Sequence, residues 1–507
     1  MLKSVRDRLS GPLAARWPSQ RPRPTRTFDG VLGDPQSYER QLDRLLDRHA
    51  TGRGMHELRQ GDVPLASAAV RQREVARLIA RTVGSGAYEP GPAELRTIRV
   101  GGKRRTVFAL GLVDLLVHGV VSDALEAAIE PTLNPRLLSY RTGVPWWRGP
   151  QDFAAWIRWH GGDRDAEGRR RGGLYVIRRD VRSYTDTIPV HDESALWPMI
   201  QRALSPDGPM TAAAAEVVRA VVRPAIVGER DADPPRERGV PTGQPISCVL
   251  FNLYLRDVDH ELAAIPGSFY TRYSDDVLFA HPDPRTVQAA ATILEERVAA
   301  LGLTLNARKS RDLYLTHAGH ASTAWPAAKG AQHVPLLGLR VGADGTVGLD
   351  ASKAREVVRD VRRRAWAAAA ATSEPDEAAR LACAVVRRAL DPGDMQAAAR
   401  AAPLLRHVVT DRLQLGELDR RIAGEVAGVL VGDRTVRAFR ALPPSVLREN
   451  YGLPSLVAQR NGRRRRAPDA TPGGGVRRGA ASPEPVRPTS PAAARSGTPV
   501  TVPADVL

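Results

Sequence analysis

The sequence contains, at residues 269–280, the run Phe269-Tyr270-Thr271-Arg272-Tyr273-Ser274-Asp275-Asp276-Val277-Leu278-Phe279-Ala280. One strand entering and one strand leaving would place the two adjacent aspartates in the turn of a β-hairpin. Adjacent carboxylates raise each other's pKa unless a cation lies between them, and Mg²⁺ is a hard cation that prefers oxygen ligands. Taken alone, an Asp-Asp pair is more typical of a solvated surface turn, so other segments must decide between the two.

A third aspartate follows another apolar run. Residues 174–177 predict a short strand, and Asp180 comes shortly after it. Because chemistry in an open sheet lies where strands end, Asp180 and Asp275 on neighbouring strands would share two metal ions. Such a site activates an attacking hydroxyl and stabilises a leaving pyrophosphate. A helix N-cap or a turn residue is the open alternative for Asp180.

Two further segments extend the pattern. A Gly/Pro-rich loop at 238–247 leads into an apolar helix expected over 248–262. Glycine in such a loop lets the backbone approach a nucleotide or template closely, although any loop before a helix can have this composition. Downstream, residues 301–309 end a helix and place Lys309 beyond a short strand. Residues 336–349 predict a second hairpin.

Composition points to a polyanionic partner. The chain has 507 residues, a length typical of about three domains. It has 74 Lys+Arg against 56 Asp+Glu, a formal net charge of +18. This balance favours nucleic acid first and an anionic membrane surface second. Hydrophobic residues make up 42% of the chain, which excludes a wholly disordered basic protein.

The cysteine count and the hydropathy pattern exclude other classes. Two cysteines, Cys248 and Cys383, rule out a disulfide framework and a Cys-based zinc cluster. No window approaches about 18 uncharged apolar residues, and charges interrupt the N-terminal segment, so neither a transmembrane helix nor a secretory signal is expected. The expectation is a cytoplasmic protein with no membrane partner.

In this order, the segments resemble bacterial reverse transcriptases of the group II intron, retron and defence-associated kind, over about residues 73–349. The resemblance implies an α+β right-hand polymerase fold, with fingers and a palm built on an antiparallel sheet, then an all-helical thumb and a disordered basic tail. The implied domains are a flexible N-terminal lead-in (1–36), N-terminal helices and fingers (37–173), a palm with the catalytic carboxylates (174–350), a helical thumb (351–460) and a disordered tail rich in Arg, Pro and Gly (461–507).

The resemblance also implies roles for residues that match the family's motifs. The Tyr-Ser-Asp-Asp turn is similar to the family's metal-binding turn, and Asp180 matches its first catalytic aspartate. Two Mg²⁺ ions, with Mn²⁺ as an alternative, would be held by Asp180, Val181, Asp275 and Asp276. The implied catalytic set adds Lys309, near the leaving pyrophosphate. The implied nucleotide contacts are Lys103, Arg105, Tyr184, Thr185, Gly243 and Gln244.

Two positions depart from the family's pattern. The family usually carries Phe or Tyr five residues after the first aspartate, where the ring blocks the 2′-hydroxyl of a ribonucleotide. Here that residue is Thr185, with Tyr184 just before it. The Gly/Pro-rich loop has Thr242 where many members carry Gln. Thr185 predicts weaker exclusion of ribonucleotides, and Thr242 alters one expected nucleotide contact. Both departures leave the metal carboxylates unchanged.

The predicted function is that of an RNA-directed DNA polymerase of the bacterial cytoplasm, which extends a nucleic-acid primer on an RNA template with deoxynucleoside triphosphates. A dedicated non-coding RNA partner and a role in phage defence are further expectations from the resemblance. Two alternatives stay open: an RNA polymerase or template-independent nucleotidyltransferase on the same fold, and a non-catalytic, maturase-like RNA-binding protein. The basic tail is expected to act as an auxiliary RNA tether.

Overall fold

The computed structural model describes residues 27–464, apart from 52–55, 57, 60–63, 101–102, 160–171, 229–235, 391–401 and 434. The described residues form two compact units. The first contains residues 27–146 and 176–312, and the second contains residues 147–175 and 313–464. All the site residues predicted from the sequence belong to the first unit.

The N-terminal part of the first unit is helical, as the apolar periodicity predicts. It contains α2 (Phe28–Leu32), α3 (Pro35–Ala50), α4 (Leu65–Val70), α5 (Gln72–Gly84), α6 (Leu112–Ile129) and a 3₁₀ turn, η2 (Glu130–Thr132). The predicted flexible lead-in over 1–36 is wrong at its end, because α2 and the start of α3 lie within it. Thr27 caps α2, and Phe28 and Leu32 bury their side chains, which explains why this segment folds. Residues 1–26 lie outside the described part of the chain.

The apolar residues on either side of Gly101 and Gly102 predict a hairpin, here called the basic hairpin for its Lys103, Arg104 and Arg105, and it is present. β1 (Glu94–Val100) and β2 (Lys103–Ala109) pair antiparallel, with Val100 opposite Lys103. The two glycines predicted to form its turn, at 101–102, lie outside the described residues. The base of β2 is attached to the Gly/Pro-rich loop, because the N–H of Phe108 donates to the carbonyl of Thr242 at 2.9 Å. The hairpin and the Gly/Pro-rich loop therefore lie side by side in the first unit.

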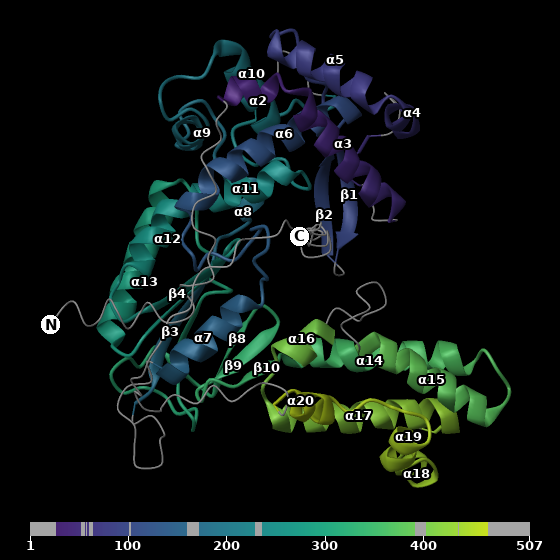
Figure 1. Cartoon of the computed structure of the whole chain (residues 1–507). Helices are drawn as coiled ribbons and strands as arrows, with labels where there is room; N and C mark the ends of the chain where they lie inside the picture. The colour runs from purple at the N-terminus through teal and green to yellow at the C-terminus, as the bar shows by residue number, and fades with distance from the viewer. Residues whose placement is uncertain are drawn as a thin grey trace, which may run out of the picture. The chain divides into compact units, whose positions relative to one another are not determined.

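The turn that carries Asp275 connects two neighbouring strands of one sheet. β4 (Phe269–Tyr273) and β5 (Asp276–His281) pair antiparallel with Tyr273 opposite Asp276, so Ser274 and Asp275 form a two-residue turn. This confirms the predicted hairpin. β3 (Leu174–Asp180) lies on the other side of β5, and β6 (Arg311–Leu315) follows beyond β3. The helices α12 (Arg256–Ala263) and α13 (Pro284–Ala300) pack on β4 and β5, respectively (Figure 1).

The remaining helices of the first unit are α8 (Tyr184–Thr187), α9 (Leu196–Leu204), α10 (Ala212–Val222) and α11 (Pro245–Tyr254). The single helix predicted over 248–262 is wrong, because the chain leaves helical geometry at Leu255 and continues as α12. The apolar residues keep their helical spacing across this break, so the sequence pattern does not reveal it. The short strand predicted before Lys309 is also wrong, since the segment forms only an isolated bridge between Leu305 and Val181.

The second unit begins with α7 (Arg148–Trp159), which packs on a three-stranded antiparallel sheet of β8 (His333–Leu336), β9 (Leu339–Gly342) and β10 (Val347–Leu349). The hairpin predicted at 336–349 is confirmed as β9 and β10. Leu337 and Gly338, both with positive φ, turn β8 into β9. The end of β6 pairs in parallel with β7 (Lys329–Ala331).

The rest of the second unit is helical, as predicted. It contains α14 (Ala351–Ala369), α15 (Pro375–Leu390), α16 (Ala402–His407), α17 (Arg412–Val431), α18 (Val436–Ala441), α19 (Pro444–Glu449) and α20 (Leu456–Arg464). Helices α14, α15 and α17 lie side by side (Figure 1). Helix α20 runs across the predicted boundary at 460, and the carboxylate of Asp419 caps its N-terminus by accepting the N–H of Leu456 and the hydroxyl of Ser455.

Of the predicted disordered tail (461–507), residues 465–507 lie outside the described residues. Within the described part of the chain, none of the helices combines the length and the apolar character needed to cross a membrane.

Candidate active site

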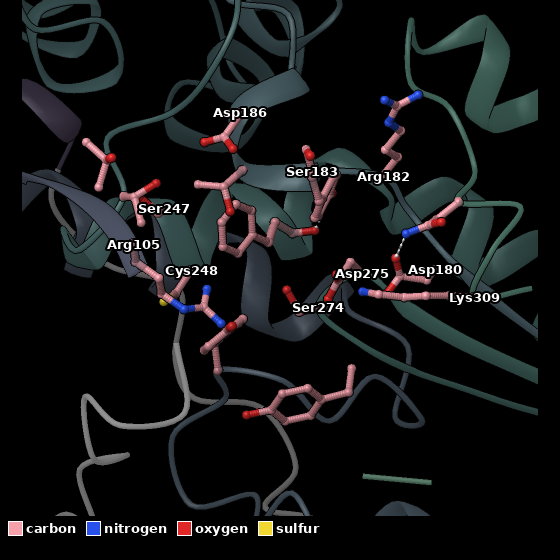
Figure 2. Close-up of a pocket in the computed structure, with 18 of the residues that line it drawn as sticks. Arg105, Asp180, Arg182, Ser183, Asp186, Ser247, Cys248, Ser274, Asp275 and Lys309 are labelled. Atoms are coloured by element: carbon pink, nitrogen blue, oxygen red, sulfur yellow. Dashed lines mark hydrogen bonds and ion pairs between the residues drawn. The ribbon is translucent and has the colours of Figure 1, made fainter. Parts of the chain in front are cut away.

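A cavity of about 1070 Å³ in the first unit joins segments that the sequence singled out separately. Its walls come from the end of the basic hairpin, the end of β3 with α8, the Gly/Pro-rich loop, the β4–β5 turn and the segment before β6. Of the predicted site residues, eight line it: Arg105, Asp180, Tyr184, Thr185, Gly243, Gln244, Asp275 and Lys309. Figure 2 shows Asp180, Asp275 and Lys309 close together in this cavity.

The two carboxylates that face the cavity are held by backbone contacts. Asp180 ends β3, and the N–H of the next residue, Val181, donates to the carbonyl of Asp275 at 2.9 Å. Ser274 has a φ of 56°, in the left-handed region, which closes the tight turn before Asp275. Burial and then the nearby charge of Asp180 raise the pKa of Asp275 to about 6. The site therefore favours a cation at this point.

Asp180 has two side-chain partners. The Lys309 ammonium lies 2.7 Å from Asp180 Oδ2, and Asn306 Nδ2 donates to Asp180 Oδ1 at 3.2 Å. The backbone N–H of Asn306 also donates to the carbonyl of Asp180 at 2.7 Å. The sequence predicted a site role for Lys309 but not for Asn306, whose only signal is its position three residues before the lysine.

Asp276 does not line the cavity. Its carboxylate pairs with the guanidinium of Arg178 on β3, with Nε at 2.8 Å from Oδ1 and a second contact from Nη2 to Oδ2. Val181, the fourth predicted metal ligand, is fully buried and also does not line the cavity. The structure thus brings two of the three predicted carboxylates into one space.

The cavity offers Mg²⁺ the carboxylate oxygens of Asp180 and Asp275. Across the described ranges, no group of three or more His, Cys, Asp or Glu side chains is arranged to hold a metal ion. Asp276, which would supply the third carboxylate, is engaged by Arg178. Mg²⁺ in phosphate-transfer sites commonly takes one or two carboxylates together with waters and substrate phosphates. Asp180 and Asp275 fit that requirement by chemistry.

The two residues after Ser183 have different surroundings. The Tyr184 hydroxyl donates to the carbonyl of Phe251 at 3.0 Å, and only 3% of the residue is exposed. Burial raises the pKa of Tyr184 well above its usual range. Thr185 is half-buried on the cavity wall, and its carbonyl accepts the N–H of Val240 at 3.0 Å. The hydrogen bond of its hydroxyl therefore fixes Tyr184 in place, while Thr185 lies on the cavity wall.

The Gly/Pro-rich loop approaches β2 closely. Gly243 has a φ of +91°, and a Cβ on it would lie 3.1 Å from the Cβ of Val107. Gln244 is 1% exposed, and its Nε2 donates to the carbonyl of Phe108 at 2.6 Å. Arg105 projects from the same strand and is exposed at the cavity. The side chain of Lys103 lies outside the described part of the structure.

Gly243→Ala is expected to lower the free energy of unfolding by about 1–2 kcal/mol through its left-handed backbone alone. It should also lower the primer-extension activity predicted from the sequence, because the added methyl group would displace β2 and Arg105 from the cavity. Thermal unfolding and primer extension measure the two effects. Gly228→Ala is the matched control, since Gly228 has a φ of +93° but nothing within 4 Å of an added Cβ. An equal loss of activity in both variants would contradict the close approach.

Residues 120–341 match the model of the family described as reverse transcriptase (RNA-dependent DNA polymerase). The matched range contains Asp180, Thr185, Gly243, Asp275 and Lys309, whereas the basic hairpin precedes it. No curated protein matches the chain.

Several solved structures of yeast telomerases are similar to this chain. The apo telomerase of Candida tropicalis truncated from its C-terminal domain is 13% identical, with a TM-score of 0.37, over 51% of this chain and 56% of that one. The Candida albicans telomerase in complex with a fragment of telomeric RNA is 12% identical, with a TM-score of 0.39, over 74% and 60%. The apo Candida tropicalis telomerase is 11% identical, with a TM-score of 0.39, over 84% and 68%.

The chain spans less than two thirds of the length of the first two of these structures. The family match runs from within α6 to β9 and covers the cavity wall apart from the basic hairpin. Residues 120–341 are therefore similar to the reverse transcriptase family, and the chain has the right-hand polymerase fold.

Proposed function

We propose that this chain is an RNA-directed DNA polymerase that extends a nucleic-acid primer on an RNA template by two-metal nucleotidyl transfer. One observation carries the proposal: Asp180 and Asp275, which are 95 positions apart in the sequence, meet in one cavity, and both lie in the range that matches the reverse transcriptase family. The neighbouring cations Lys309 and Arg105 suit a substrate that carries a triphosphate.

The carboxylates would hold divalent cations together with the substrate. Asp180 and Asp275 are the proposed Mg²⁺ ligands, with Mn²⁺ as an alternative. The resemblance adds the carbonyl of Val181 and the carboxylate of Asp276 to this proposal. When bound, the ions would lower the pKa of the primer 3′-hydroxyl and neutralise charge on the triphosphate.

The protein's own groups would position the reactants. Lys309 is 58% exposed at its side chain and stands beside Asp180, where it would place positive charge near the departing pyrophosphate. Arg104 and Arg105 would draw the triphosphate to the hairpin side of the cavity. The close approach of Gly243 to Val107 holds the Gly/Pro-rich loop against β2 beside the cavity. Catalysis of this kind depends mostly on positioning and electrostatics.

A basic stripe in the second unit suits a nucleic-acid duplex. The exposed face of α14 carries Arg355, Arg359, Arg363 and Trp366 at helical spacing, and Trp366 is 64% exposed. Arginine neutralises phosphates, and an exposed aromatic ring can stack on bases or sugars. We propose that this stripe contacts the template–primer duplex.

The double variant R355E/R359E is expected to weaken template–primer binding and to reduce the salt dependence of binding. Each lost phosphate contact should lower the slope of log K against log salt by about 1. Fluorescence anisotropy over a salt series measures this slope. The control is R387E/R388E, which changes the charge equally at two exposed positions on a different helix, α15. Equal slopes for the two variants would show that the stripe makes no specific contact.

Thr185 favours a second candidate function. A small, polar residue on the cavity wall leaves room for a 2′-hydroxyl, so the same site would also incorporate ribonucleotides. A labelled primer on a heteropolymeric RNA template, supplied with dNTPs or rNTPs, separates these outcomes. The proposed function predicts DNA of template-limited length and complementary sequence. Extension without template, or extension with rNTPs but not with dNTPs, would contradict it.

Three expectations stay predictions from the resemblance alone: a dedicated non-coding RNA, a role in phage defence, and a place in the bacterial cytoplasm. Co-purified nucleic acid, once sequenced, would test the first of them.

A further inference from the structure

Arg272 places a charge at the centre of an apolar strand. Its side chain has no exposed surface, although it lies two residues before the turn that carries Asp275. A guanidinium has five N–H donors in a fixed planar arrangement. All five have acceptors here, supplied by Asp259 and by three backbone carbonyls. Such complete saturation makes the position of the side chain unique.

One side of the guanidinium forms a buried ion pair. Nε and Nη2 of Arg272 lie 2.7 and 2.6 Å from the two oxygens of Asp259 on α12. The hydroxyl of Tyr270 donates to the same carboxylate at 2.5 Å. A buried pair of this kind is weak evidence for stability, since the desolvation of two charges offsets much of their attraction. Its presence calls for another physical role.

The other side of the guanidinium joins two parts of the cavity wall. Nη1 donates to the carbonyl of Ser274 at 2.8 Å and to the carbonyl of Phe251 at 3.2 Å, and Nη2 donates to Asn252 at 3.5 Å. Phe251 and Asn252 lie in the last turn of α11, whose carbonyls have no partner within the helix. Ser274 is the turn residue next to Asp275. A single side chain therefore fixes the acidic turn against the end of α11.

The same carbonyl of Phe251 also accepts the hydroxyl of Tyr184 at 3.0 Å. Tyr184 directly precedes Thr185, the residue proposed to face the substrate sugar. The carbonyl of Phe251 therefore connects this part of the cavity wall to the turn before Asp275. The rings of Tyr184 and Phe251 also pack with their centroids 5.1 Å apart. Movement of Arg272 would therefore displace both the carboxylate of Asp275 and the Tyr184–Thr185 part of the cavity wall.

We propose that Arg272 is a positioning residue that sets Asp275 and the Tyr184–Thr185 wall in one fixed arrangement through the carbonyls of Ser274 and Phe251. The inference rests on the proposed function, since it concerns the same cavity. It differs from a purely structural role because the contacts that matter are those to the carbonyls, not the ion pair with Asp259. Removing the whole charged cluster should spare stability and still damage the site.

The test uses a triple variant, Tyr270→Phe with Asp259→Leu and Arg272→Met, in the full chain. Apolar replacement of a complete buried cluster is often neutral or stabilising, so we expect a Tm within about 3 °C of the parent. The turn would lose its anchor, and kcat for primer extension should fall about 10²-fold, as expected for a small misplacement of a reacting group. The KM for template–primer should stay unchanged.

A second readout does not depend on activity. The N–H of Val181 is protected by the carbonyl of Asp275, so its hydrogen exchange reports directly on the position of the turn. We expect faster exchange at Val181 in the triple variant. A parental exchange rate together with a parental kcat would overturn the proposal. If the parent itself fails to extend a primer, the proposed function is wrong, and the exchange rate at Val181 still decides the role of Arg272.

Two single variants complete the test. Arg272→Lys keeps the charge beside Asp259 but offers at most three donors without the planar geometry, so it should also lower kcat and speed exchange at Val181. If the triple variant fails to fold, a parental kcat and parental exchange in Arg272→Lys would overturn the proposal. The control is Arg223→Met, which removes an arginine bound to the carboxylate of Asp192 and the carbonyl of Val190, outside the cavity. It should leave both readouts unchanged.

Discussion

Asp275→Asn is expected to lower the rate of primer extension by about 10³-fold or more. The loss follows from removing one of the two carboxylates that face the cavity, because a bound metal ion typically contributes several kcal/mol and about 1.4 kcal/mol corresponds to a tenfold rate change. Asp180→Asn should have a similar effect. Binding of the RNA template, measured by anisotropy, should stay near the parental value, since neither carboxylate attracts a polyanion. Retained extension by the double variant would contradict the metal assignment.

Asp276→Asn is the informative comparison for this prediction. The sequence predicts an equal role for Asp276, but the structure pairs it with Arg178 outside the cavity. We therefore expect a smaller loss of rate than for Asp275→Asn, because Asp180 and Asp275 keep their places. Single-nucleotide incorporation at saturating Mg²⁺ measures the difference. An equal loss would show that Asp276 leaves Arg178 and joins the other two carboxylates when substrate is bound.

Thr185→Phe is expected to increase the preference for dNTPs over rNTPs by up to about 10²-fold, the usual limit when an apolar wall rejects an added hydroxyl. The parent should discriminate weakly, because Thr185 lines the cavity while Tyr184 is held by the carbonyl of Phe251 and cannot move to replace the missing ring. The ratio of kcat/KM for matched dNTP and rNTP in single-nucleotide extension measures this preference.

Thr185→Val separates size from polarity. It keeps the shape of threonine and removes the hydroxyl. If the size of the residue controls the sugar, Thr185→Val should select like the parent and only Thr185→Phe should become strict. Strict selection of dNTPs by the parent itself would show that another group excludes the 2′-hydroxyl.

Local sequence patterns predicted the elements that carry the site. Apolar and aromatic residues on both sides of Asp275 and Asp276 indicated the hairpin, and the apolar run before Asp180 indicated a strand. Both signals are local, because a short apolar run is visible within a few residues. Glycine in the Gly/Pro-rich loop was expected to allow a close approach of the backbone, and Gly243 has the positive φ that glycine readily adopts.

Contacts between distant segments could not be predicted in the same way. The pairing of Asp276 with Arg178 depends on β3 lying beside β5, and nothing local indicates which of two adjacent aspartates faces the cavity. The anchor formed by Arg272 left one signal, a charged residue in an apolar and aromatic strand. Because buried arginines are almost always paired, that signal predicts a buried acidic partner. It does not identify Asp259 as that partner.

The most direct test of the central claim is a structure of the protein bound to an RNA template, a primer without a 3′-hydroxyl, a matched dNTP and Mg²⁺. We expect the triphosphate to lie in the cavity, with metal ions between it and the carboxylates of Asp180 and Asp275. We also expect the sugar to face Thr185. A triphosphate bound elsewhere, with Asp180 and Asp275 making no contact to metal or phosphate, would contradict it.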